Sequence, residues 1–156
     1  MRSLYGMAAA LALAAHTPSM AQSYDVDAPP ADRSQIVLGD GDNSSIDIEG
    51  AKLHGATFTF KQVRIDRNGW LVMHPFENGE PKGTVYVGAS YVPAGVNEDV
   101  AITVDPAPQP GEPYIVMLHY DMNDDQVFDF NDGITVPDAP VFEGNTMIAH
   151  RYEAPS

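Results

Sequence analysis

Short runs of apolar residues, most of them alternating with polar residues, are separated along this chain by clusters of Gly, Pro, Asn and Asp. Alternation with a period of two is typical of β-strands, and after the first 21 residues no segment shows the period of 3.6 that an amphipathic helix requires. Strands are predicted over residues 34–38, 44–49, 57–65, 70–74, 85–91, 98–104, 114–120, 127–130 and 145–152. We therefore expect an all-β domain, an antiparallel, immunoglobulin-like β-sandwich of seven to nine short strands, with a small barrel or jelly roll as the other possibility.

The strand predicted over 57–65 changes phase along its length. Phe58 and Phe60 fall on one face, but Val63 falls on the other. Because the side-chain period of a strand is two, this pattern predicts a β-bulge near Gln62.

Residues 1–21 have the pattern of a secretory signal peptide. Arg2 gives a positive start, the apolar run from 4 to 15 is too short to span a bilayer, and Ser19 and Ala21 are small residues at the −3 and −1 positions of a cleavage site. An uncleaved anchor would be the alternative, and the Pro and polar residues around the site argue against it.

Cleavage after Ala21 leaves 135 residues. We expect residues 22–33 to be a flexible leader and residues 34–156 to form a single domain. No second apolar stretch is long enough to cross a membrane, so we expect an exported monomer, periplasmic or extracellular.

The cleaved chain is strongly acidic. It carries 22 acidic and 7 basic residues, because only Arg2 is lost with the signal, and its net charge is −15. This field repels nucleic acid and anionic lipid headgroups, so we expect neither as a partner and look instead to a protein or another envelope component. Cysteine is absent, so no disulfide can stabilise the domain, and a bound ion is another way to do so.

Oxygen-bearing residues at alternate positions follow the strand predicted over 114–120. They match positions 1, 3, 5, 7, 9 and 12 of a calcium-binding loop. In chain order the six residues are Asp121, Asn123, Asp125, Val127 through its carbonyl, Asp129 and Asp132. Gln126 stands where Gly usually makes the sharp turn, and no helices flank the loop. We therefore expect either a Ca²⁺ site between strands, with calcium as the cofactor, or an acidic loop closed by Asx turns.

A second candidate metal site combines His74, Met117 and His119. Met117 and His119 share one strand face, and His together with Met suits copper or another soft metal. Met147 and His150 lie on a further strand but point to opposite faces. The structural alternative is that the methionines fill the core and the histidines are hydrogen-bonded.

Enzyme function is the class that the sequence supports least. No Gly-x-Ser-x-Gly elbow and no Cys nucleophile is present. We expect an exported, non-catalytic module with a structural or binding role in the cell envelope, stabilised by calcium. A periplasmic copper or other metal-binding protein is the first alternative, and a small secreted hydrolase is the second.

The order of several motifs resembles a family of exported, acidic domains of unknown function, found on surface proteins of halophilic archaea and in bacterial secreted proteins. The motifs are a Gly-Trp strand ending in His74, the Gly-x-Ser connection of 88–95, the Leu-His-x-Asp-x-Asn run of 118–123 and the Phe-Asp-Phe of 128–130. The resemblance covers residues 57–152 and departs from the pattern at Asp138-Ala139-Pro140, where a Gly is expected. It implies an exported β-sandwich and no established activity.

Overall fold

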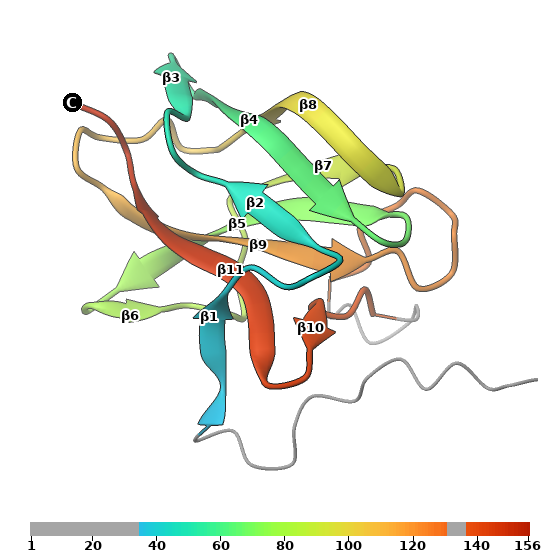
Figure 1. Ribbon diagram of the computed structural model, residues 1–156. Helices are drawn as coiled ribbons and strands as arrows, with labels where there is room; N and C mark the ends of the chain where they lie inside the picture. The colour runs from blue at the N-terminus through green and yellow to red at the C-terminus, as the bar shows by residue number, and fades with distance from the viewer. Residues whose placement is uncertain (1–34, 131–136) are drawn as a thin grey trace, which may run out of the picture.

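The computed structural model describes residues 35–130 and 137–156, which form eleven β-strands (Figure 1). Within these ranges no helix is long and apolar enough to cross a membrane. The predicted signal peptide (1–21), the predicted leader (22–33) and Asp132 lie outside the described residues.

The larger sheet positions the candidate site. Its main path follows β1 (Val37–Gly39), β11 (Thr146–Glu153), β9 (Pro113–Tyr120), β5 (Gly69–Glu77) and β6 (Glu80–Pro81). In addition, β7 (Gly88–Val92) pairs with β5, and β10 (Phe142–Glu143) pairs with β11. The pairing of β1 with β11 is parallel, and the other pairings in this sheet are antiparallel. Strand β9 lies between β11 and β5 and is buried from Tyr114 to Tyr120, as expected for so apolar a run.

The smaller sheet is built around β4 (Thr57–Ile65). Strand β8 (Gly95–Thr103) pairs along one edge of β4. Strands β2 (Ser45–Asp47) and β3 (Lys52–His54) pair with the two ends of β4 on its other edge. All of these pairings are antiparallel.

The two faces of the larger sheet bury different sets of side chains. Alternate residues of β5 and β9 join the core shared with the smaller sheet, including Leu71, Met73, Val116 and Leu118. The residues between them, Trp70, Val72, Ile115 and Met117, form a second apolar cluster on the outer face together with Ala149 of β11. Within the described part of the chain, loops and not a third sheet cover this outer face, so it can hold a pocket.

The all-β sandwich predicted from the sequence is confirmed, but its strands are more numerous than the seven to nine expected. The additional ones are β3, β6 and β10, which are only two or three residues long. The strand predicted over 127–130 is wrong. The rings of Phe128 and Phe130 stack on each other with centroids 5.5 Å apart, and both pack against His119, so this segment covers the outer face as a loop.

Candidate functional site

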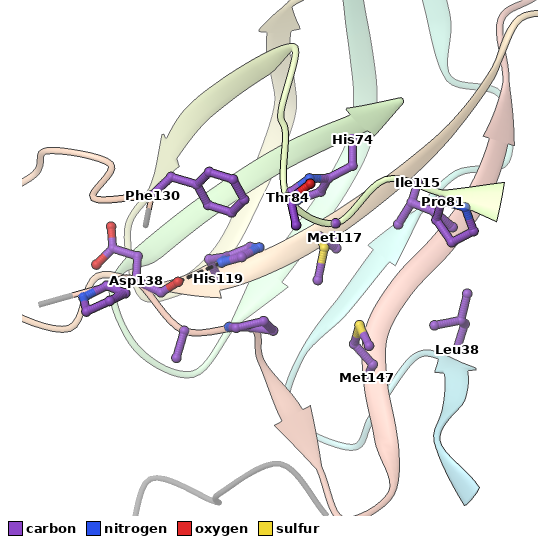
Figure 2. Close-up of a pocket in the computed structure, with 14 residues that line it drawn as sticks. Leu38, His74, Pro81, Thr84, Ile115, Met117, His119, Phe130, Asp138 and Met147 are labelled. Carbon is purple, nitrogen blue, oxygen red and sulfur yellow. Dashed lines mark hydrogen bonds between the residues drawn. The ribbon is translucent and has the colours of Figure 1, made fainter. Parts of the chain in front are cut away.

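A pocket of about 590 Å³ lies on the outer face of the larger sheet (Figure 2). Strands β5, β9 and β11, residues 81–84 and residues 137–140 contribute to its lining. Most lining residues are apolar. The lining also includes His74, Met117, His119 and Met147, whose side chains can bind a soft metal. The structure thus brings together all three residues of the second candidate site and adds a fourth.

Strand register determines how the two histidines meet. Across the β5–β9 pair, Val72 lies opposite Met117, His74 lies opposite Ile115, and His119 lies opposite Trp70. The histidines therefore flank Met117 from opposite directions along the strands. Their rings converge, with centroids 5.7 Å apart and planes inclined by 33°.

Each histidine is fixed by one hydrogen bond to the main chain. Nδ1 of His74 lies 2.6 Å from the carbonyl oxygen of Val85, and Nδ1 of His119 lies 2.8 Å from that of Asp138. A carbonyl oxygen can only accept, so Nδ1 carries the proton in both rings. The two Nε2 atoms are buried and have no hydrogen-bond partner among the described residues. In the neutral rings each Nε2 therefore keeps a free lone pair.

Burial favours the neutral form of both imidazoles. It lowers the pKa of His119 to about 4; the hydrogen bond to Asp138 opposes this shift, and the charge interaction with His74 contributes to it. Burial also lowers the pKa of His74. At neutral pH both Nε2 lone pairs are available to a ligand.

The acidic loop begins directly after β9. Asp121 is buried, and its carboxylate accepts hydrogen bonds from the main-chain N–H groups of Asp125 (3.3 Å) and Gln126 (3.0 Å). The carboxylate of Asp125 accepts from the N–H of Val127 at 2.8 Å. The described part of the loop is thus closed by Asx-type turns.

Three of the residues predicted to bind calcium meet at the side chain of Asn123. Its amide nitrogen donates to carboxylate oxygens of Asp125 (2.9 Å) and Asp129 (3.2 Å). Among residues 35–130 and 137–156, no group of three or more His, Cys, Asp or Glu side chains is arranged to hold a metal ion. Asp132 lies outside these residues.

Asp138 connects the acidic loop to the pocket, and sequence reasoning missed this role. Its carbonyl holds His119, while its buried carboxylate accepts from the N–H groups of Met122 (2.9 Å) and Asp129 (3.1 Å). Burial raises the pKa of this carboxyl group, the two N–H groups lower it, and the charges of Asp121 and Asp129 raise it. The only available signal was the departure from the family pattern at Asp138-Ala139-Pro140.

The fold and the pocket define a β-sandwich domain with a largely apolar pocket on the outer face of one sheet. Residues 44–154 match the family described as Domain of unknown function (DUF7282), and the chain belongs to this family. The chain is also similar to Cell surface glycoprotein 1 of the halophilic archaeon Haloarcula hispanica, with 24% identity over 111 residues. That match covers 70% of this chain but only 12% of the glycoprotein. No solved structure matches the chain. The resemblance stated from the sequence motifs is thereby confirmed.

Proposed function

We propose that this protein is a non-catalytic module of the cell envelope that binds a metal ion between His74 and His119. Its similarity to a cell surface glycoprotein and its predicted signal peptide support the location. The binding role is supported by the pocket.

The observation that carries the proposal is the pair of buried Nε2 atoms that have no partner within residues 35–130 and 137–156. Leaving a buried polar atom unsatisfied costs about 1–3 kcal/mol. A metal ion that accepts both lone pairs would remove this cost at His74 and His119 together. The hydrogen bonds from Nδ1 to main-chain carbonyls support this role, because they hold the ring orientation and tautomer that metal-binding histidines use.

The distance between the two rings suits a shared ion. An imidazole nitrogen binds a metal at about 2.0–2.1 Å, so two ring centroids around one ion can be at most about 6.4 Å apart. The centroids of His74 and His119 are 5.7 Å apart, within this limit.

The rest of the lining favours binding over catalysis. Among the described lining residues, Thr84 supplies the only hydroxyl group and Asp138 the only carboxylate. The Asp138 carboxylate already accepts two main-chain N–H groups, so it is poorly placed to act as a general base.

Calcium at the acidic loop is a second proposal, for stabilisation only. The observation in its favour is the Asn123 amide group between the carboxylates of Asp125 and Asp129. If this amide were reversed, its oxygen and the two carboxylates would offer hard oxygen ligands to Ca²⁺.

Elemental analysis of the full chain tests the metal proposal. The protein is expressed with its signal, purified from the exported fraction, exposed to copper or zinc salts and desalted. We expect about one metal ion per chain, and a loss of most of it in the double variant His74→Asn with His119→Asn. The Asn side-chain amide can still donate the hydrogen bond that each Nδ1 makes, but it has no counterpart of the Nε2 atom. The exposed His54 on β3 gives the matched control, His54→Asn. Equal metal content in the wild type and the double variant would refute the proposal.

A further inference from the structure

We propose that the ion taken by this pocket is Cu(I), held by Nε2 of His74 and His119 and by the thioether sulfurs of Met117 and Met147. This inference rests on the proposed function above and adds to it the oxidation state of the ion and two sulfur ligands.

The sheet places Met117 beside the histidines, and Met147 lies one strand farther out on β11, because Pro140 bridges to His119 and Phe142 pairs with Met147. Met117 is two residues before His119 on β9, so the two side chains share the outer face. Across the sheet, Met117 pairs with Ala149 of β11, and Met147 precedes Ala149 by two residues on that same face. All four side chains line the pocket, and Figure 2 shows Met117 below His74 and to the right of His119, with Met147 farther away on β11.

The ligand types discriminate between metals. Imidazole binds zinc, copper, iron and nickel alike, so the histidines alone select none of them. Protein zinc sites use imidazole, thiolate, carboxylate and water, and thioethers are not among their usual donors. Thioether sulfur is a soft ligand that selects Cu(I). Met117 and Met147 therefore favour Cu(I) over Zn(II).

The charge of the site favours the same ion. Both imidazoles and both thioethers are neutral ligands, so a bound ion keeps its full charge in a largely apolar pocket. The Born cost of burying an ion grows with the square of its charge, so a divalent ion would cost about four times as much as a monovalent one. The only carboxylate in the described lining, that of Asp138, is occupied by the N–H groups of Met122 and Asp129. Of the ions that these ligands attract, Cu(I) is the monovalent one.

Competition with a Cu(I)-specific chelator tests this assignment. The full chain is titrated without oxygen against the coloured Cu(I) complex of bicinchoninate, and separately with Zn(II) and Cu(II). Met117→Leu and Met147→Leu remove sulfur with little change in volume, and leucine is well tolerated in place of methionine. Met122→Leu is the control, because Met122 lies at the acidic loop and outside the pocket lining.

We expect the wild type to remove Cu(I) from the chelator, and its affinity for Cu(I) to exceed its affinity for Zn(II) or Cu(II). Each pocket variant should bind Cu(I) at least tenfold more weakly, and Met122→Leu should match the wild type. Cu(I) binding that depends on the histidines but not on either methionine would overturn the inference and leave the proposed function intact. An affinity for Zn(II) higher than that for Cu(I) would have the same consequence. Metal binding that is indifferent to His74 and His119 would overturn both.

Discussion

The imidazoles of His74 and His119 lie with ring centroids 5.7 Å apart, although the main chains of these two residues do not pair with each other. His74 lies opposite Ile115, and His119 lies opposite Trp70, so each ring must lean along its strand to reach the other above Met117. Both rings are held in this position by bonds from Nδ1 to carbonyl oxygens of loops that cross the outer face. The pocket is therefore organised by the register of β5 and β9 together with two loops.

The stability of the metal-free protein should fall in acid because of His119. Its pKa is lowered to about 4 in the folded state, against 6.5 as the ordinary value. Below pH 6.5 His119 binds a proton in the unfolded chain but not in the folded protein. Stability is therefore lost as the pH falls from 6.5 towards 4. The loss from this one group is up to about 3 kcal/mol, at 1.36 kcal/mol per pKa unit.

Urea unfolding between pH 7 and pH 4 with a chelator present measures this effect. His119→Asn removes the titrating group, so the difference in unfolding free energy between wild type and variant should shift in favour of the variant as the pH falls. A difference that does not change with pH would show that His119 is not buried in its neutral form.

Asp138 should contribute to stability out of proportion to its size. Its buried carboxylate accepts from Met122 and Asp129, and Asp138→Ala would leave both N–H groups without that acceptor. Bonds to a charged group contribute about 1.5–3 kcal/mol each, so we expect the loss of two to lower the unfolding free energy by about 3–6 kcal/mol. The matched control is Asp124→Asn, since Asp124 is exposed and its φ of 56° suits Asn. Equal stability of the two variants would contradict this role.

Glu143 should hold the loop before β2 against the hairpin that carries Met147. Its carboxylate accepts main-chain N–H groups of Asp42 (2.7 Å), Asn43 (3.0 Å) and Ser44 (2.7 Å). We expect Glu143→Gln to lower the unfolding free energy by about 1–3 kcal/mol, because the amide group offers one acceptor oxygen where the carboxylate has two. Glu153→Gln, at an exposed 3.3 Å ion pair with Arg151, should change it by less than about 0.5 kcal/mol.

A second substitution checks the geometry of the same contact. A Cβ atom on Gly41 would lie 2.3 Å from the Glu143 carboxyl carbon, so Gly41→Ala must displace that carboxylate. In a double-mutant cycle, Gly41→Ala should therefore lower the unfolding free energy much less in the Glu143→Gln background than in the wild type. Additive effects would contradict the contact.

Calcium should raise the melting temperature if it binds the acidic loop. The carboxylates gathered around Asn123 repel one another, and a divalent cation would relieve that repulsion. A free Ca²⁺ concentration one hundred times the dissociation constant raises the unfolding free energy by about 2.7 kcal/mol, a change that a thermal melt resolves. Asp125→Asn should abolish the response. An unchanged melting temperature when excess chelator is added to calcium-loaded protein would remove the calcium proposal.

The longer strands could be predicted because their patterns extend over eight or nine residues. The predicted range 57–65 coincides with β4, and 114–120 differs from β9 by one residue. The short strands β3, β6 and β10 have too few residues to show alternation, and they exist because a longer neighbour offers them an edge.

The phase change in β4 was predicted correctly, but its cause differs from the expected bulge. Phe60 and Val63 are both buried, with exposed Lys61 and Gln62 between them. The register of β4 with β8 is the same before and after this point. Only the pair that would join Lys61 to Asp99 is missing, and Asp99 has a positive φ of 50°. Both strands are therefore distorted together, whereas a bulge inserts a residue into one strand only.

For the pocket, the sequence identified residue types that can bind a soft metal but not their arrangement. His74, Met117 and His119 could be named because histidine with methionine indicates a soft metal. That Met147 joins them, and that Asp138 holds His119, depends on where β11 and residues 137–140 pack, which strand periodicity does not determine.

X-ray absorption at the copper edge, on the full chain loaded anaerobically with one equivalent of Cu(I), tests the metal site most directly. We predict a first shell of imidazole nitrogen and thioether sulfur, with the nitrogen contribution lost in the His74→Asn, His119→Asn double variant and the sulfur contribution reduced by Met117→Leu. A first shell of oxygen ligands only, or a spectrum that the double variant leaves unchanged, would contradict a metal site between His74 and His119.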